Sequence, residues 1–264
     1  MDRFYDYELF KAKFYSLSYI DLNLYKEKQM KRRITSLVEK YGFSTYIAFL
    51  EEIKVNKELY NIFINYLTIN VSEFYRNPNQ WELFEKRIIP EIAKVKNLPE
   101  VKIWSSACST GDEPYTVVMI LNKFLPLEKI SILATDIDNN AMQKAKMGLY
   151  SSRSLKELPK EFLDKHFIKV NEDLYQLSEK VRRCVQFKQL NLLRDPYPKG
   201  MDIILCRNVL IYFTEEAKDY IFAEFSKSLI KNGVLFIGST EQIMNYQKFD
   251  IRPIETFFYQ KIER

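Results

Sequence analysis

The first 75 residues carry apolar side chains at the spacing of amphipathic helices. One stripe repeats at intervals of four, three and four residues, which places its members on one helix face. The stripe consists of Met30, Ile34, Leu37 and Tyr41. Gly42 suits the position just after the helix end, and apolar runs at residues 46–50 and 59–67 predict two further helices. We therefore predict a helical domain over residues 1–77.

From about residue 81 the pattern changes to short β-rich runs that alternate with helical ones. The predicted strands are Val101–Trp104, Ile130–Thr135, Val185–Leu190, Met201–Cys206, Gly233–Gly238 and Thr256–Lys261. The predicted helices lie near residues 81–92, Tyr115–Phe124, Asn140–Met147 and Glu215–Ile230. Such alternation is typical of a mostly parallel sheet with helices on both faces, so residues 78–264 are predicted to form an α/β domain.

A polar insert interrupts this alternation between Leu149 and Arg183. Two segments within it, residues 164–170 and 173–178, have the composition of short strands. The insert is therefore predicted to be a small antiparallel β subdomain over about residues 150–184.

The segment Ile103–Tyr115, with the sequence IWSSACSTGDEPY, places a loop of small residues between a short strand and a helix. Small side chains let the main chain approach a ligand closely, and Gly111 enters positive φ without strain. Glu113 stands at the predicted helix start, with Pro114 in the first turn, where a missing N–H costs nothing. A strand, a loop and a helix N-terminus in this order form the place where α/β sheets bind nucleotides.

The next predicted strand ends in Asp136, whose carboxylate suits ribose hydroxyls. The loop has neither the G-x-G-x-x-G pattern of dehydrogenases nor the Gly-Lys-Ser/Thr of a P-loop. Because Glu113 adds a negative charge beside the loop, the pattern disfavours a phosphate and favours a nucleoside that carries a positive charge. S-adenosylmethionine is the common ligand of that kind, and we predict it as the cofactor.

Composition narrows the class of protein. Of the 264 residues, 47% are hydrophobic, which is enough for a full core, and the net charge of +5 is too small to indicate nucleic acid. No apolar run approaches the ~18 residues that cross a bilayer, and the N-terminus lacks a signal-peptide pattern. The three cysteines have neither pairing number nor metal spacing, and His166 is the one histidine. We expect a soluble cytoplasmic protein without a metal.

Six motifs stand along the chain in a distinctive order. They are Asn70–Arg76 (NVSEFYR), Ser109–Tyr115 (STGDEPY), Ala134–Asp138 (ATDID), Asn191–Leu193 (NLL), Cys206–Phe213 (CRNVLIYF) and Gly238–Glu241 (GSTE). In this order and spacing they resemble the CheR-type chemotaxis receptor methyltransferases, from about residue 20 to the C-terminus. The resemblance implies a Rossmann-like methyltransferase domain behind a helical N-terminal domain. It also implies methyl transfer from S-adenosylmethionine to receptor glutamates, giving glutamyl methyl esters and S-adenosylhomocysteine.

Site residues follow from the same resemblance. It assigns the cofactor site to Asn70, Ser72, Arg76, Glu113, Asp136, Asn191, Leu192, Asn208 and Val209. It places Arg76 and Tyr212 nearest the chemistry. Three departures from the family pattern are mild: Ser72 keeps the hydroxyl of the usual threonine, Ala107 replaces a common glycine, and Asp112 replaces a glutamate.

The implied reaction asks little of acid–base groups. A glutamate side chain has an ordinary pKa near ~4.3, so at neutral pH the nucleophile is already ionised and needs no general base. The enzyme must align oxygen, methyl carbon and sulfur and exclude water. Arg76 can hold the acceptor carboxylate in a fork of N–H donors, and Tyr212 is assigned orientation. Asp138 is predicted to cap the helix after it, and Glu241 to be structural.

The basic segment at residues 26–33 carries four cations of interest. Lys28 and Arg32 lie opposite the apolar stripe of the predicted helix, and Lys31 and Arg33 lie at its flanks. Such a run is usually a solvated face, but the resemblance implicates this region in docking the acidic methylation helices of receptors, so we predict a docking surface. Residues 169–174 are short and lack the glycine of members that bind a receptor's C-terminal pentapeptide. We expect a monomer that works without this tether.

Two other functions compete with this interpretation. Residues 195–198 (DPYP) faintly resemble the Asp-Pro-Pro-Tyr box of nucleic-acid amino methyltransferases, but they precede the predicted strand that such a box should follow. Cys206 is not preceded by proline, as the nucleophile of a cytosine C5 methyltransferase would be. A non-catalytic cofactor-sensing adaptor would dock receptors without turnover, and the presence of both Arg76 and Tyr212 counts against it.

Overall fold

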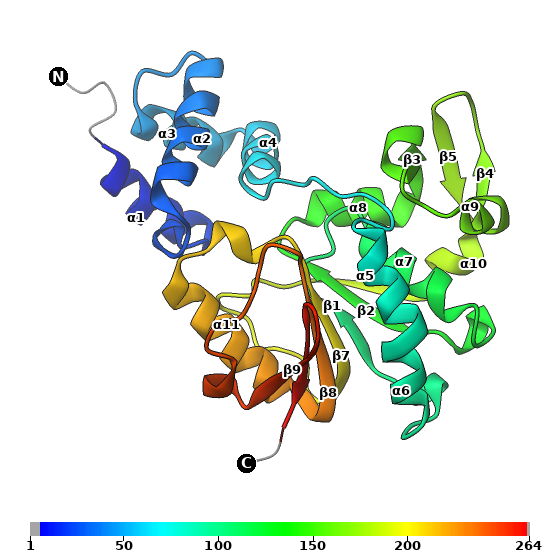
Figure 1. Cartoon of the computed structure of the whole chain (residues 1–264). Helices are drawn as coiled ribbons and strands as arrows, with labels where there is room; N and C mark the ends of the chain where they lie inside the picture. Colours follow the sequence, from blue (N-terminus) through cyan, green and yellow to red (C-terminus); the bar gives the residue numbers. More distant parts are fainter. Residues whose placement is uncertain (1–5, 263–264) are drawn as a thin grey trace. The chain divides into compact units, whose positions relative to one another are not determined.

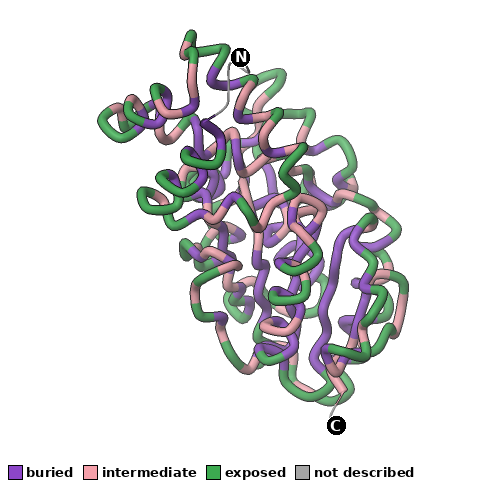
Figure 2. The backbone as a smooth tube through the Cα atoms, turned by 90° about the vertical axis from the view of Figure 1, so that its left-hand side faces the viewer, coloured by how far each residue is buried: buried purple, intermediate pink, exposed green. Residues whose placement is uncertain are grey.

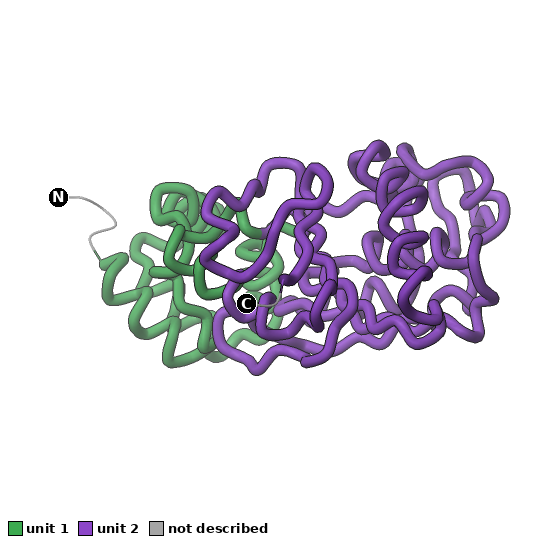
Figure 3. Tube along the Cα trace, turned by 60° about the horizontal axis from the view of Figure 1, so that its bottom comes forward, with its two compact units in different colours: residues 1–70, 210–221 green, residues 71–209, 222–264 purple. Residues whose placement is uncertain are grey.

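The computed structural model describes residues 6–262, which divide into two compact units (Figure 3). The first unit comprises residues 1–70 and 210–221, and the second comprises residues 71–209 and 222–264. This division lies seven residues before the predicted boundary at residue 77. The difference arises because Phe74 packs within the second unit, where its ring centroid lies 4.7 Å from that of Tyr150 and its main-chain N–H donates to the Ser154 carbonyl.

The first unit is helical, as the apolar spacing predicts (Figure 1). Its elements before residue 70 are α1 (Tyr7–Ser18), η1 (Leu22–Leu24), α2 (Glu27–Lys40), α3 (Tyr46–Val55) and α4 (Lys57–Leu67). Met30, Ile34 and Leu37 of α2 are buried, but Tyr41 is 39% exposed and does not belong to the buried face. The reason is local: α2 ends at Lys40, and Gly42, with φ of 78°, turns the chain away.

An aromatic core joins these helices. Phe63 of α4 contacts Phe14 of α1 and Phe49 of α3, with ring centroids 5.1 and 5.2 Å apart in edge-to-face arrangements. The starts of α3 and α4 are capped: the Thr45 hydroxyl accepts from the Ala48 N–H, and Asn56 Oδ1 accepts from the Leu59 N–H. Packing and capping together explain how these short helices are stable.

The chain returns to the first unit late in the sequence. The 3-10 helix η6 (Leu210–Tyr212) and the first half of α11 (Glu215–Ser228) belong to it. The Tyr212 carbonyl accepts from the Lys26 N–H, the Thr214 N–H donates to the Leu24 carbonyl, and Tyr25 forms an isolated β-bridge with Phe213. Tyr212 is thereby fixed through its main chain beside the start of α2.

A seven-stranded sheet forms the centre of the second unit, with the order β6-β2-β1-β7-β8-β10-β9. The strands are β1 (Ile103–Ser105), β2 (Ile132–Asp136), β6 (Val185–Gln189), β7 (Met201–Cys206), β8 (Leu229–Ile237), β9 (Ile251–Glu255) and β10 (Phe258–Lys261). β10 is antiparallel to both of its neighbours, and the five strands from β6 to β8 are parallel. The predicted, mostly parallel sheet is thus confirmed.

Helices pack on both faces of this sheet. Ser105, Leu205 and Phe236 are paired in one row across β1, β7 and β8, whereas Trp104 belongs to the adjacent row, which faces the other way. Phe236 contacts Trp81, with ring centroids 5.4 Å apart, and Trp104 contacts Phe225 of α11 at 5.5 Å. Figure 2 shows the strands as largely buried.

The strand predictions for the seven-stranded sheet fail in two places. β9 is absent from the prediction because Pro253 and the charged residues around it disguise it, but an edge strand tolerates proline, since one side of its backbone has no strand partner. The predicted helix to Ile230 ends instead at Ser228, and β8 starts at Leu229, which pairs with Met201.

Other helices surround the sheet. They are α5 (Pro78–Leu83), the π-helical η2 (Phe84–Ile88), α6 (Ile89–Ala93), η3 (Leu98–Glu100), α7 (Asp112–Leu121), η4 (Leu127–Lys129), α8 (Asn139–Met147) and η7 (Tyr246–Phe249). The first three form the run predicted at residues 81–92, which begins earlier, at Pro78. Pro90 lacks the N–H that an α-helical bond to residue 86 needs, which is consistent with a π-helical turn before it.

The insert is the predicted small antiparallel sheet, with one more strand than expected. Its order is β3 (Leu149–Ser151), β5 (Leu174–Leu177) and β4 (Phe167–Lys169), accompanied by η5 (Ser152–Leu155), α9 (Lys160–His166) and α10 (Glu179–Arg182). The predicted strand at residues 164–170 is helical as far as His166. Within residues 6–262, no helix is long and apolar enough to cross a membrane.

Candidate active site

The loop between β1 and α7 is held by main-chain bonds to both neighbouring strands. The Ser106 N–H and hydroxyl both donate to the Leu205 carbonyl of β7, and the Cys108 N–H donates to the Thr135 carbonyl of β2. Gly111 has φ of 88°, and a Cβ there would lie 2.8 Å from the Ala145 side chain. Only glycine fits this position, as the sequence predicts.

Asp136 ends β2 beside this loop. One of its carboxylate oxygens accepts from the Ser109 N–H at 2.7 Å, and the other accepts from the Asp138 N–H at 2.9 Å. Burial raises the pKa of this carboxyl to about 6, although the backbone N–H donors oppose the shift. Asp138 caps α8 as predicted, because its carboxylate accepts from the Asn140 and Ala141 N–H groups. Asp136 is thus free of the capping role and keeps lone pairs for a ligand.

Two further carboxylates stand at the start of α7. Glu113 Oε1 accepts from the Ser105 hydroxyl at 2.8 Å, and its Oε2 lies 3.6 Å from Arg207 Nη1. Asp112 is buried and accepts from the Thr110 hydroxyl at 2.6 Å. Burial raises the pKa of both carboxyls; Arg207 opposes the shift at Glu113, and the Thr110 and Ser72 hydroxyls oppose it at Asp112. The site therefore concentrates acidic groups at a helix N-terminus, where the helix dipole favours them.

The segment before α5 carries Arg76 in an unusual backbone. Tyr75 and Asn77 on either side of it have φ of 57° and 63°, in the left-handed region that non-glycine residues rarely adopt. The Arg76 carbonyl accepts from the Trp81 indole at 3.0 Å and from Arg207 Nη2 at 2.8 Å. Its half-buried side chain makes one hydrogen bond, from Nη1 to the Val71 carbonyl at 3.3 Å. Main-chain contacts therefore set the direction of this arginine.

Arg207 is the site residue that the sequence analysis misses. It follows β7 and has a buried guanidinium that lies over the rings of Trp81 and Phe236, 4.7 and 4.6 Å from their centroids. Burial lowers its pKa to about 10, so it stays protonated at neutral pH, and Glu113 and Glu241 oppose the shift. A charged residue directly after a fully buried strand is the signal that could have revealed it.

The ends of β6 and β7 hold the remaining predicted residues of this unit. Asn191 accepts from the Leu193 N–H through Oδ1, and Leu192 next to it is buried. Asn208 has φ of 60°, and its N–H donates to Glu241 Oε2 at 2.7 Å. That same oxygen accepts from the Gly238 N–H at 2.9 Å, which agrees with the structural role predicted for Glu241.

The structure brings eight of the predicted residues into one unit. They are Ser72, Arg76, Glu113, Asp136, Asn191, Leu192, Asn208 and Val209. Six of them lie at or near the carboxyl ends of the parallel strands: Asp136 ends β2, Glu113 lies at the start of α7, Asn191 and Leu192 follow β6, and Asn208 and Val209 follow β7. Figure 1 shows the arrangement of β1, β2, β7 and α7. Asn70 and Tyr212 belong to the other unit, where Asn70 Nδ2 donates to Asn65 Oδ1 at 2.7 Å.

The residues that could suggest another chemistry are buried. Cys108, Cys184 and Cys206 are free and buried, and burial raises the pKa of each thiol. His166 is buried, and its pKa is lowered to about 4 by burial. Tyr197, from the segment that resembles a methyltransferase box, packs on Trp104 and donates to the Leu192 carbonyl. Among residues 6–262, no group of three or more histidine, cysteine or acidic side chains could hold a metal.

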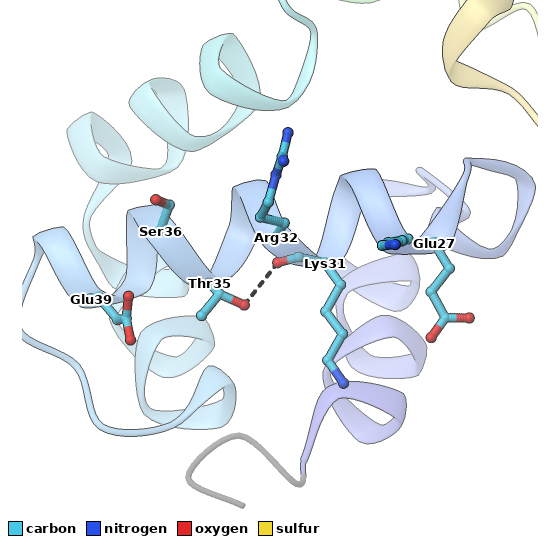
Figure 4. A pocket seen from close by; sticks show the side chains of 7 residues that line it. Glu27, Lys31, Arg32, Thr35, Ser36 and Glu39 are labelled. Carbon is cyan, nitrogen blue, oxygen red and sulfur yellow. Dashed lines mark hydrogen bonds between the residues drawn. The ribbon is translucent and has the colours of Figure 1, made fainter.

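The basic face of α2 lines a shallow depression with a volume of about 730 Å³ (Figure 4). Its lining consists of Glu27, Lys28, Lys31, Arg32, Thr35, Ser36 and Glu39. Arg32 extends away from the helix, and the Lys31 ammonium lies 5.2 Å from the Tyr7 ring centroid. Arg33 is not part of the lining, because its guanidinium lies over the Tyr66 ring and donates to the Tyr66 carbonyl.

This fold and this site define the class of the protein. A doubly wound sheet with one antiparallel strand next to its edge, a glycine-containing loop after β1 and an acid at the end of β2 form the S-adenosylmethionine-dependent methyltransferase architecture. The acidic side chains of Glu113 and Asp136 beside this loop fit a cationic nucleoside. The residues present can therefore hold S-adenosylmethionine.

Comparisons with known proteins agree with this class. The family model "CheR methyltransferase, SAM binding domain" matches residues 70–258, and "CheR methyltransferase, all-alpha domain" matches residues 5–68. The chemotaxis protein methyltransferase of Listeria monocytogenes is 40% identical over 242 residues, which cover 92% of each chain. That of Borreliella burgdorferi is 34% identical, covering 85% of this chain and 83% of the relative. The protein belongs to the CheR methyltransferase family and is an S-adenosylmethionine-dependent methyltransferase of the chemotaxis type.

Asp136 generates a testable pH dependence. Because its pKa lies at about 6, lowering the pH from about 7 to about 5 should protonate the carboxylate and weaken the affinity for S-adenosylhomocysteine by up to about tenfold. Calorimetric titration at several pH values measures this, and Asp136→Asn should bind more weakly without that dependence. The matched control, Asp138→Asn, should keep it. An unchanged pH profile in Asp136→Asn would refute the assignment.

Protonation of Asp136 should weaken cofactor binding but stabilise the folded protein. Its folded pKa is raised, so the folded protein binds more protons than the unfolded chain between about pH 4 and pH 6. The contribution of Asp136 to the free energy of unfolding therefore increases as the pH falls through this window. Denaturant unfolding of the protein and of Asp136→Asn without cofactor should show this difference.

Proposed function

We propose that this protein transfers the methyl group of S-adenosylmethionine to glutamate side chains of chemotaxis receptors, forming glutamyl methyl esters and S-adenosylhomocysteine. It acts in the cytoplasm as a monomer and uses no metal. The observation that carries the proposal is the pairing of opposite charges within one unit. A half-buried arginine, Arg76, is fixed by its main chain to Arg207, which lies 3.6 Å from the acidic side chain of Glu113.

The charges suit the two reactants. A sulfonium cofactor is a cation, and Glu113 and Asp136 are the groups that would favour it, with Asp136 accepting from the ribose hydroxyls. The acceptor is an anion, and Arg76 would hold its carboxylate through N–H donors. Ser72, Asn191, Leu192, Asn208 and Val209 complete the part of the proposed cofactor site that lies in this unit. Asn70 and Tyr212, which belong to the other unit, remain proposed site residues.

The reaction balances without a base. A carboxylate oxygen attacks the methyl carbon, the carbon–sulfur bond breaks, and sulfur keeps the electron pair, so the sulfonium becomes a neutral thioether and no proton moves. The buried His166 is therefore not required. The protein contributes alignment and exclusion of water, and intramolecular alignment can be worth up to about 7–11 kcal/mol. Charge is neutralised in the transition state, so Arg76 must orient the carboxylate without over-stabilising it.

Methyl transfer is the direct test. Labelled S-adenosylmethionine and receptor-containing membranes should give protein-bound label that alkali releases, as expected for an ester. Arg76→Ala should lower the rate about 100-fold or more, because the acceptor loses its orienting partner. The matched control is Arg183→Ala, which removes an exposed arginine of the same unit and should leave the rate unchanged.

Other results would point to the competing functions. Cofactor binding by the wild-type protein without alkali-labile label would contradict the proposal and favour a cofactor-sensing adaptor. Label in DNA or tRNA in place of receptor would identify a nucleic-acid methyltransferase.

For receptor docking we propose the basic face of α2. Lys28, Lys31 and Arg32 line the depression, and their three positive charges outnumber the two carboxylates there. This surface suits an acidic helix of a receptor. Arg33, also predicted to dock, has its guanidinium engaged by Tyr66, so we assign it to holding α2 against α4.

Charge reversal tests the docking surface. Lys28→Glu with Arg32→Glu should raise KM for the receptor about tenfold or more, with a steeper effect at low salt, and should leave the affinity for S-adenosylhomocysteine unchanged. Lys57→Glu makes the same kind of charge change at the exposed start of α4 and serves as the control. Equal KM values for all three proteins would exclude this surface.

We also propose that methylation does not depend on a receptor tether. The turn between β4 and β5 is closed by bonds from the Val170 and Asn171 N–H groups to the Leu174 carbonyl, and it contains no glycine. Receptors that lack their last five residues should be methylated at the same rate as intact ones. Micromolar binding of the corresponding pentapeptide in a calorimeter would overturn this.

A further inference from the structure

Arg207 occupies a position that is costly for a charge. Its side chain is 3% exposed, and its guanidinium lies over the aromatic rings of Trp81 and Phe236. A hydrophobic side chain would fill this space without the penalty of removing a guanidinium from water. The reason for an arginine must therefore lie in the groups that its N–H donors reach.

Those donors reach two different parts of the candidate active site. Nη2 donates to the Arg76 carbonyl at 2.8 Å and to Gln80 Oε1 at 2.9 Å, and Nη1 lies 3.6 Å from Glu113 Oε2. One planar guanidinium thus joins the segment that carries Arg76 to the carboxylate at the start of α7. Lysine has no such fork and could not serve both ends at once.

The segment that Arg207 holds does not maintain its shape by itself. Tyr75 and Asn77 have left-handed backbones, which cost free energy and persist only where surrounding contacts impose them. The Arg76 carbonyl between them accepts from the Trp81 indole as well as from Arg207. The Arg76 side chain makes one long hydrogen bond to the local main chain. The orientation of Arg76 therefore depends on its main chain.

We propose that Arg207 is a positioning residue for methyl transfer: it fixes the main chain of Arg76 relative to the carboxylate of Glu113. It thereby aligns Arg76, which would hold the acceptor carboxylate, with Glu113, which would favour the cationic cofactor. This rests on the proposed function, in which Arg76 contacts the reacting groups. Arg207 itself acts only through Arg76 and Glu113.

A double-mutant cycle between Arg207 and Arg76 tests the proposal. Arg207→Lys keeps a positive charge beside Glu113 but loses the fork, and it should lower kcat about 10- to 100-fold and weaken S-adenosylmethionine binding, with thermal unfolding nearly unchanged. In an Arg76→Ala background, the same substitution should cause less than about twofold further loss of kcat or affinity. A merely structural residue would give equal losses in both backgrounds, and this outcome would overturn the proposal, as would full activity of Arg207→Lys.

A second variant decides the question if Arg207→Lys does not fold. Gln80→Ala removes one acceptor of Arg207 and leaves the arginine in place. It should cause a smaller loss of kcat and affinity, about three- to tenfold, that also disappears in the Arg76→Ala background. Gln260→Ala, on β10, is the matched control and should have no effect. A loss from Gln80→Ala that persists without Arg76 would refute the proposal.

The affinity measurements distinguish a failure of the role proposed for Arg207 from a failure of the proposed function. They follow S-adenosylmethionine binding by calorimetry and need no methyl acceptor. If receptors are not methylated, the proposed function fails while the binding cycle still reports on Arg207. If receptors are methylated and the cycle is additive, only the role of Arg207 fails.

Discussion

The loop after β1 is largely buried, so its main-chain N–H and C=O groups must find partners inside the protein. They find them on the strands at either side: Ser106 bonds to β7, Cys108 bonds to β2, and Ser109 bonds to the carboxylate that ends β2. This requirement fixes the loop, the start of α7 and the end of β2 as one rigid assembly. The candidate site depends on it, because Glu113 and Asp136 receive their places from these bonds.

The second feature of the site is its concentration of buried charge. Burial raises the pKa values of Asp112, Glu113 and Asp136, which means that the ionised forms are costly in the folded protein. Arg207 offsets part of this cost at Glu113. Hydroxyl donors offset part of it at Asp112, and backbone N–H donors do so at Asp136. Such an arrangement is poor for stability and well suited to a cationic cofactor, and strongly shifted carboxyl groups in one place are typical of functional sites.

The two units provide different surfaces for the proposed function. The second unit holds the sheet, the acidic groups and Arg76, whereas the first carries the basic face of α2 and the main-chain anchor of Tyr212. In the proposed function, the docking surface therefore lies in one unit and the buried bonds around the β1 loop lie in the other. Tyr212 belongs to the first unit but lies in the motif Cys206–Phe213, which begins in the second unit.

The sequence by itself predicted the helical stripe of α2, six strands of the large sheet and the positive φ of Gly111, and its motif spacing supplied the candidate site residues. These are local properties: periodicity, a positive φ and motif spacing are all read from neighbouring residues. The tertiary structure decided what depends on distant partners. β9 forms because β10 offers it an edge, Tyr41 is exposed because α2 ends before it, and Arg33 is engaged because Tyr66 lies beside it. Arg207 belongs to this group as well, because its contacts come from residues 76–81, 113 and 236, and no local pattern brings those together.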